Sequence, residues 1–258
     1  MKRIQEQLKT RWLGQNYIYR EEVTSTNDAL RSLADEKAPM GTVLLANQQT
    51  AGRGRKGRTW ESPAGKGLWF SLLLRPPLHP REAVALTLVT AVGICRGLDY
   101  YPGLGAAIKW PNDILCDSKK LGGILSEINA AQEKLHYVVI GVGLNLQAAY
   151  LSESVAPIAV GMEDILQQGV DQRELLCRLL LGLESVYDEF FHNGFGLLRQ
   201  EWEERSPMLG KEVHVSTVNG DLDGVVLGLS EEGFLRLQLE NGKVAHVISG
   251  DVQMVEGR

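Results

Sequence analysis

Apolar residues along this chain fall into short runs separated by polar and turn-forming segments. Runs of four to eight such residues, bounded by glycine, proline or polar clusters, are typical of β-strands. The pattern predicts strands over residues 16–23, 42–47, 67–74, 123–129 and 137–141. The last two are expected to pair with each other, and residues 116–120 just before them are predicted to be the tip of a hairpin. Because residues 137–141 are uniformly apolar, we expect that strand in the centre of a sheet.

Apolar residues at helical spacing occur between and after these strands. Residues 24–27 offer N-cap side chains for a helix that reaches about Lys37. Residues 82–100 are predicted to form a core helix, and residues 196–204 a shorter one. The strongest helical pattern begins at an N-cap Asp171 and places on one face Leu175, Leu176, Leu179, Leu183, Val186 and Phe190.

The pattern changes near Ser206 and Pro207. From there to residue 255, short strand-like segments are separated by dipeptides that favour hairpin turns, namely Asn219-Gly220, Glu232-Gly233 and Asn241-Gly242. Short strands at this spacing are typical of a small barrel. The chain is therefore predicted to be α+β. One domain over residues 1–206 is built on a mixed or antiparallel sheet packed with helices, and a small β-barrel covers residues 207–258.

The 258 residues, 44% hydrophobic and 23% charged, are typical of a soluble globular protein. The net charge of −5 argues against broad nucleic-acid binding, so a local cluster of arginines indicates a site. The beginning of the chain lacks the apolar core of a signal peptide, and the longest apolar stretch, residues 83–98, is too short and too interrupted to span a bilayer. The three cysteines and five histidines are scattered, so no disulfide framework or metal cluster is predicted, and a reducing cytoplasm is expected.

The arginines lie in a glycine-rich loop at residues 50–60, TAGRGRKGRTW. Residues 52–57 match the G-x-G-x-x-G pattern of dinucleotide-binding folds, but residues 58–63 are a poor helix start, and no acidic residue lies about twenty positions on. The loop alone is also consistent with a solvated basic segment. Arginine binds phosphate and carboxylate oxygens bidentately, and glycine lets the backbone approach a ligand. Because fixing such a loop costs conformational entropy, we expect an anionic ligand to order it.

A second motif reads KWPNDI and runs into KKLGGILSE. Pro111 removes a backbone donor and fixes φ, so Asn112 and Asp113 are predicted to lie at a turn flanked by Lys109 and Lys120. A lysine is most often a surface side chain, but the two glycines soon after Lys120 suggest close approach of a ligand. Asp113 is equally consistent with a residue that caps the turn and with a magnesium ligand that shares the ion with substrate phosphates.

Three further polar or aromatic residues lie beside these motifs. Trp60 and Trp110 are candidates for the walls of a pocket that holds an apolar ring, or for ordinary core residues. Asn145 ends the motif GVGLN, where it either reads an adenine edge or caps the turn after the buried strand. Taken alone, the pattern at Asn145 favours the cap.

Five segments in fixed order, STN, GRGRKGRTW, KWPNDI, KLGGILSE and GVGLN, resemble the catalytic domain of biotin–protein ligases. The segment that begins at Gly210, with GKEVHV and VISGDV, resembles the small C-terminal barrel of that family. The resemblance covers nearly the whole chain and implies a class II synthetase-like biotin/lipoate ligase fold followed by an SH3-like barrel. Some members carry an N-terminal winged helix-turn-helix and repress transcription. With only about sixteen residues before its first strand, this sequence resembles the single-function type, for which no DNA binding is expected.

The resemblance also implies roles for individual residues. The positions that match biotin contacts are Ser25, Thr26, Asn27, Gln49, Arg53, Arg55, Lys120 and Gly123, with Trp60 as a pocket wall. The positions that match ATP or adenylate contacts are Arg55, Arg58, Lys109, Asn112 and Asn145. The residues expected to act in catalysis are Arg53, Arg55, Lys120 and Asp113, with Asp113 as the candidate magnesium ligand. Residues 146–161 are weakly patterned and predicted to be a mobile loop, and residues 148–159 match only loosely the family's loop that closes over adenine.

The implied activity is that of an ATP-dependent ligase. With Mg²⁺, it would form biotinyl-5′-AMP and then transfer biotin to a lysine of a biotin carboxyl carrier domain, as in acetyl-CoA carboxylase. Biotin, ATP and that carrier domain are the expected partners, without a membrane, and a homodimer is left open. The nearest alternative is a lipoate or octanoate ligase. A regulator that binds biotinyl-AMP and contacts DNA or protein is an alternative of a different class.

Overall fold

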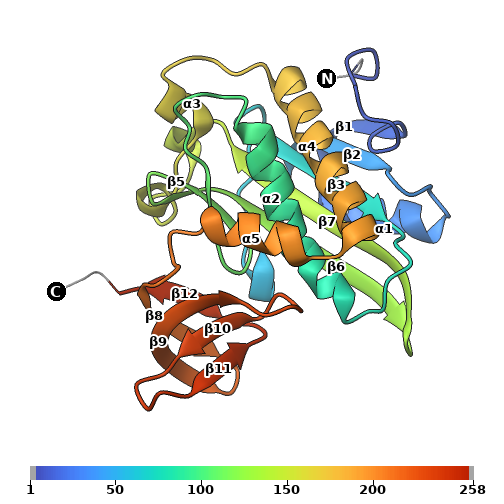
Figure 1. Ribbon diagram of the computed structural model, residues 1–258. Coiled ribbons are helices and arrows are strands. Elements are labelled where there is room, and N and C mark those ends of the chain that lie inside the picture. Colours follow the sequence, from blue (N-terminus) through green and yellow to red (C-terminus); the bar gives the residue numbers. More distant parts are fainter. Residues whose placement is uncertain (1–3, 256–258) are drawn as a thin grey trace.

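A mixed seven-stranded sheet forms the centre of the structure, a computed structural model in which residues 4–255 are described (Figure 1). The strand order is β1-β2-β3-β7-β6-β5-β4, in which β1 and β2 are parallel and the other neighbouring pairs are antiparallel. The strands are β1 Tyr17–Val23, β2 Val43–Gln49, β3 Gly67–Leu74, β4 Ala107–Lys109, β5 Asp113–Cys116, β6 Lys119–Ala131 and β7 Lys134–Asn145.

Helices cover both faces of this sheet because alternate residues of its central strands point to opposite sides. Leu72 and Leu74 of β3 belong to the large core under α2, α4 and α5, which lie together in Figure 1. Leu73 packs on the opposite face with Leu30 of α1. The helices are α1 Thr26–Asp35, α2 Leu86–Leu98, α3 Met162–Leu166, α4 Gln172–Asn193 and α5 Gly196–Glu204, with 3-10 turns η1 Arg55–Gly57, η2 Glu82–Ala85, η3 Ala148–Tyr150 and η4 Ala156–Ile158.

The C-terminal segment forms a second, antiparallel sheet, drawn in orange and red in Figure 1. Its order is β11-β10-β9-β8-β12, and glycines with positive φ lie at the three predicted turns. Apolar residues of this sheet join the core of the main sheet. The strands are β8 Glu212–Thr217, β9 Gly220–Leu229, β10 Leu235–Gln238, β11 Val244–Val247 and β12 Asp251–Met254.

The predicted barrel is not closed. Among the described residues, β11 and β12 are the two edges of the C-terminal sheet and do not pair with each other. The short connection between them turns instead toward the glycine-rich loop, where Ser249 and Gly250 accept hydrogen bonds from Arg55. The result is an SH3-like five-stranded sheet with two open edges.

Most predicted elements are confirmed. α5 has the predicted bounds, and the Asp171 side chain accepts hydrogen bonds from two backbone N–H groups at the start of α4. Ser25 caps α1 by accepting one hydrogen bond, from the backbone N–H of Asp28. β7 is the fourth of the seven strands, so the uniformly apolar run does lie at the centre of the sheet.

Three local predictions are corrected. The helix expected over residues 82–100 begins as the 3-10 turn η2 and is α-helical only from Leu86 to Leu98. β6 and β7 extend beyond the core as a hairpin, where the residues are mostly exposed and apolar and polar side chains are mixed without a strand-like pattern. Asp113, expected at a turn, begins β5 and pairs with Gly123 of β6.

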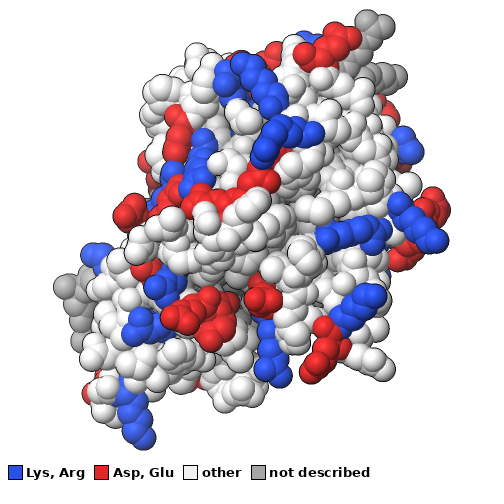
Figure 2. All heavy atoms as spheres, turned by 45° about the vertical axis from the view of Figure 1, so that its right-hand side comes forward, with Lys and Arg blue, Asp and Glu red and all other residues white. Residues whose placement is uncertain are grey.

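The surface gives two further observations. Figure 2 shows basic and acidic side chains interspersed over one face, rather than a large area of one sign. Within residues 4–255, no helix is both long enough and apolar enough to cross a membrane. The chain passes from the main sheet and its helices to the C-terminal sheet between Glu204, the end of α5, and Glu212, the start of β8. Apolar residues of both parts belong to one continuous core. A domain boundary at residues 206 and 207 therefore stays a prediction.

Candidate active site

A cavity of about 280 Å³ lies over β6 and β7. It is enclosed by the glycine-rich loop of residues 50–60 (the Gly-Arg loop), by residues 151–159 and by the first two residues of β12. Motifs spread over more than a hundred residues converge here. Every residue singled out in the sequence lines this cavity: Ser25, Thr26, Asn27, Gln49, Arg53, Arg55, Arg58, Trp60, Lys109, Asn112, Asp113, Lys120, Gly123 and Asn145.

One end of the cavity is polar, buried and without formal charge. Gln49 Oε1 accepts from the backbone N–H of Thr26 at 2.8 Å and from its hydroxyl at 3.1 Å. The hydroxyl of Ser71, on β3, lies 2.6 Å from Oδ1 of Asn27 and 2.8 Å from Oγ1 of Thr26. Asn27 also donates to Glu127 Oε2 at 2.7 Å. These bonds fix neutral donors and acceptors in place, as recognition of a neutral polar ligand requires.

Trp60 forms the wall next to this polar end, and its indole packs edge to face on Trp69 with the ring centroids 6.3 Å apart. A Cβ at Gly143 would lie 2.4 Å from Trp60 Nε1, and one at Gly123 would lie 3.1 Å from Cζ3 of the same ring. The glycines of GVGLN and KLGGILSE are therefore needed because the indole lies directly against the backbone of β6 and β7. Trp110, also a predicted wall, lines the cavity and is buried.

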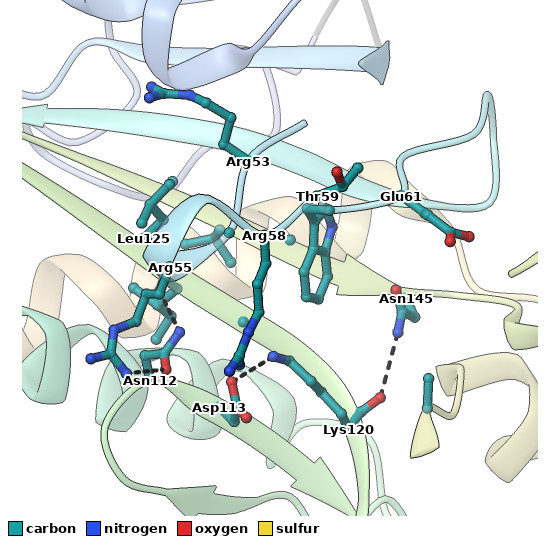
Figure 3. Close-up of a pocket in the computed structure, with 18 of the residues that line it drawn as sticks. Arg53, Arg55, Arg58, Thr59, Glu61, Asn112, Asp113, Lys120, Leu125 and Asn145 are labelled. Atoms are coloured by element: carbon teal, nitrogen blue, oxygen red, sulfur yellow. Dashed lines mark hydrogen bonds and ion pairs between the residues drawn. The ribbon is translucent and has the colours of Figure 1, made fainter. Parts of the chain in front are cut away.

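Lys120 is the cation at the middle of the cavity. Its Nζ lies 2.7 Å from Oδ1 of Asp113 and 5.2 Å from the centroid of the Trp60 ring (Figure 3). Asn145 is buried, and its Nδ2 lies 3.5 Å from the carbonyl oxygen of Lys120. Asn112 donates to the carbonyl of Ile124 at 2.9 Å. Both asparagines thus have local structural bonds while their side chains line the cavity.

The Gly-Arg loop is a hairpin whose two arms are held by backbone bonds. Arg53 pairs with Thr59 across the arms, and Trp60 N donates to Gly52 O at 2.9 Å. Figure 3 shows the Arg53 side chain directed away from Lys120 and Asp113. Its Nη2 binds Asp28 Oδ1 at 2.7 Å and Glu127 Oε2 at 2.8 Å. The Arg53 guanidinium is therefore engaged by two acids of the protein, and only part of this residue faces the cavity.

The other cations of the loop contact the C-terminal sheet. Nη1 of Arg55 lies 3.3 Å from Asn112 Oδ1 and 3.4 Å from Gly250 O, and Nη2 lies 3.2 Å from Ser249 Oγ. Burial lowers the pKa of the Arg55 guanidinium, while the carboxylates of Asp251 and Asp113 act in the opposite direction. Arginine nevertheless stays charged at neutral pH.

Asp251, at the start of β12, binds two further cations of the loop. Its Oδ2 lies 3.2 Å from Nζ of Lys56 and 2.5 Å from Nη2 of Arg58. Burial acts to raise the pKa of the Asp251 carboxyl, but the bonds and charges of Lys56 and Arg58 outweigh it and hold that pKa below its ordinary value. The C-terminal sheet therefore fixes the tip of the loop over the cavity.

Three residues of the site could not be recognised from the motifs. Ser71 is a polar residue inside the otherwise apolar segment of β3, a signal that could have identified it. Glu127 ends the motif KLGGILSE and Asp251 lies within VISGDV, but nothing in those motifs indicates that their partners are Arg53 and Arg58. Those pairs join positions far apart in the chain and depend on the fold.

Comparison with known proteins adds independent findings. Residues 18–145 match the model of the Biotin/lipoate A/B protein ligase family, and residues 208–255 match that of the Biotin protein ligase C terminal domain. The chain is 35% identical to the bifunctional ligase/repressor BirA of Bacillus subtilis over 96% of this chain and 76% of that protein. It is 34% identical to the biotin--[acetyl-CoA-carboxylase] ligase of Mycobacterium tuberculosis over 88% of this chain and 85% of the other.

Solved structures agree with these matches. The biotin protein ligase from Aquifex aeolicus in complex with biotin and ATP superposes with a TM-score of 0.80 and 29% identity, covering 94% of this chain and all of that one. The main sheet, the helices on it and the C-terminal sheet are thus an arrangement already seen with both ligands bound to the Aquifex protein.

Proposed function

This chain belongs to the biotin/lipoate A/B protein ligase family and is a biotin protein ligase, and we propose that the cavity under the Gly-Arg loop is where it activates biotin. The enzyme forms biotinyl-5′-AMP and pyrophosphate from biotin and ATP, and then transfers biotin to the lysine of a carrier domain with release of AMP. The assignment of individual residues below is our proposal.

One observation carries this assignment: a single cavity joins an uncharged polar end to a mouth rich in cations. Biotin has a neutral ureido ring at one end and a carboxylate at the other. The ring would be held by Ser25, Thr26, Asn27 and Gln49, with Trp60 against its apolar side. The carboxylate would then reach Lys120, while the phosphates of ATP lie toward Arg55 and Arg58.

The first step requires two anions to meet. A carboxylate oxygen attacks the α-phosphorus of ATP, and the bond from that phosphorus to the bridging oxygen of pyrophosphate breaks. Lys120, Arg55 and Arg58 would neutralise the charge that builds up on the phosphate oxygens, an effect that is strong in a cavity shielded from water. Lys109, Asn112 and Asn145 would position the nucleotide. In the structure Lys120 is paired with Asp113. The phosphates of ATP would compete with Asp113 for Lys120, so this ion pair would be exchanged when ATP binds.

Magnesium would enter with ATP. Within the described residues, no group of three or more His, Cys, Asp or Glu side chains is arranged to hold a metal ion. A single carboxylate, Asp113, fits an ion that is held mainly by phosphate oxygens and water, which is a common arrangement for Mg²⁺. The ion would reduce the negative charge of the phosphates.

In the second step the neutral ε-amine of a carrier lysine attacks the acyl carbon of the adenylate, and AMP leaves. The mixed anhydride reacts with water, so it must be shielded until the carrier arrives. The Gly-Arg loop, held by the C-terminal sheet through Arg55 and Asp251, would provide that shield. A biotin carboxyl carrier domain is the proposed protein partner. Association of two copies through a sheet edge stays a prediction, as does the reducing cytoplasm that the three free cysteines fit.

The test is pyrophosphate release by the purified protein with Mg·ATP and one acid at a time. Release with biotin, and little with lipoate or octanoate, is the expected result. Equal release with lipoate would contradict the proposed fit of the polar end to a ureido ring.

A further inference from the structure

Residues 151–158 form one wall of the cavity, to which Leu151, Val155 and Ile158 contribute apolar side chains. The backbone on either side of this wall segment is attached firmly. Before it, the N–H groups of residues 146 and 147 donate to Lys66 O at 3.0 and 3.2 Å. After it, Val160 N donates to the carbonyl of Lys120 at 3.0 Å.

The middle of the wall segment has a different attachment. Among the described residues, its hydrogen bonds to anything outside residues 148–159 all go to one side chain, Glu61. Ser152 N donates to Glu61 Oε2 at 2.9 Å, and the Ser152 hydroxyl donates to Oε1 at 2.5 Å. Ser152 O in turn accepts from the N–H groups of Val155 and Ala156, each at 2.9 Å. Glu61 therefore fixes the first residue of the turn that carries Val155 and Ile158.

Glu61 itself belongs to the arm of the Gly-Arg loop that reaches the polar end of the cavity. The residue before it, Trp60, donates to Gly52. The residue after it, Ser62, accepts from the backbone of Gln49 at 3.1 Å and from its side chain at 2.8 Å. Figure 3 shows Glu61 with its carboxylate directed away from Lys120 and Asp113. A ligand that holds Trp60 and Gln49 in place also holds Glu61 in place.

We propose that Glu61 is a positioning residue for the adenylation step, through which biotin binding prepares the nucleotide side of the cavity. The inference rests on the proposed function, in which biotin contacts Gln49 and Trp60, and it adds that the wall segment faces the base of ATP. Ile158 lines the cavity and is 63% exposed, so this apolar wall has surface that a nucleotide base would cover. Coupling of this kind is reciprocal: biotin raises the affinity for ATP by the factor by which ATP raises that for biotin.

The test combines kinetics with direct binding of Glu61→Ala, Ser152→Ala and the double variant. Two charge-assisted hydrogen bonds at a half-exposed position predict a rise of roughly five- to tenfold in KM for ATP with Glu61→Ala. We expect kcat and the Kd for biotin alone to change less than about twofold, because Glu61 does not touch biotin or the reacting atoms. Ser152→Ala removes only the hydroxyl bond and should have a smaller effect, and the double variant should match Glu61→Ala, which already removes both bonds. Glu61→Gln, which keeps an acceptor oxygen, should recover part of the loss.

Glu153→Ala is the matched control, because it removes an exposed acid from the same segment and leaves both hydrogen bonds between Ser152 and Glu61 in place. A rise in KM for ATP that is no larger with Glu61→Ala than with Glu153→Ala would overturn the proposal. So would a rise in the Kd for biotin alone that is as large as the rise in KM for ATP with Glu61→Ala. If the unaltered protein forms no adenylate, the proposed function fails on its own. The role of Glu61 is then still decided by calorimetry, which measures the Kd for ATP with and without biotin. Biotin must increase the affinity for ATP in the unaltered protein, and it must do so less in Glu61→Ala.

Discussion

Replacing Arg55 by glycine should make the enzyme release its adenylate. The Arg55 side chain fixes the Gly-Arg loop through hydrogen bonds of 3.2–3.4 Å to Asn112, Ser249 and Gly250. Bonds of this length to uncharged acceptors contribute about 0.5–1 kcal/mol each, or about 2 kcal/mol together. Glycine adds backbone freedom worth about 0.5–1 kcal/mol. If these contacts break when the loop opens, the total of about 2.5–3 kcal/mol predicts a release that is about 70- to 160-fold faster.

The assay forms biotinyl-AMP on the enzyme from labelled ATP, removes free nucleotide, and follows loss of label after excess unlabelled adenylate is added. Arg55→Ala is the matched control, because it removes the three bonds without the added freedom of glycine, and it should show about a 30-fold increase. A release rate for Arg55→Gly within twofold of the unaltered enzyme would refute the reasoning. It would mean that these bonds do not hold the loop closed over the product.

Three more predictions concern the cavity and its C-terminal cover. Lys120→Ala should slow adenylate formation by about a hundredfold or more while Lys119→Ala, at the neighbouring exposed position, has little effect, as single-turnover kinetics would show. Gly143→Ala should raise the Kd for biotin by about tenfold or more, because the new methyl group displaces the Trp60 indole; calorimetry with unchanged affinity would contradict this. Asp251 has a lowered pKa in the folded protein, so its contribution to stability is present above its ordinary value of 3.8 and is lost as pH falls through the folded-state pKa. The difference in melting temperature between the unaltered protein and Asp251→Asn should therefore be constant from about pH 5 to 7 and shrink below about pH 4; a difference that grows on acidification would be inconsistent with the ion pairs.

The elements of the fold were predictable where burial dictates the pattern. The apolar run of β7 and the one-sided leucines of α4 are determined by the core, and the structure contains both as predicted. The outer ends of β6 and β7 could not be found in the same way, because their hairpin extends past the core and burial does not dictate which of its residues are apolar. The open edges of the C-terminal sheet could not be predicted either, because no local pattern records the contact of residues 249 and 250 with Arg55.

The site shows the same division. Residue type and spacing were sufficient to identify the Gly-Arg loop and Lys120 as ligand-facing groups, and the resemblance to biotin–protein ligases named the ligands. The sequence could not show that Arg53 pairs with Asp28 and Glu127, or that Asp251 binds Arg58. Such ion pairs follow from how the loop, α1 and the C-terminal sheet meet, which is a property of the tertiary structure rather than of any motif.

The central claim is that this cavity makes biotinyl-5′-AMP and protects it until a carrier lysine arrives. The most direct test mixes the protein with biotin and Mg·ATP, separates protein from small molecules by gel filtration, and identifies the bound species by mass spectrometry before and after a biotin carboxyl carrier domain is added. The account predicts biotinyl-AMP bound to the protein, followed by its loss and the appearance of biotin on one carrier lysine. Absence of the adenylate from both the protein and the filtrate would contradict it.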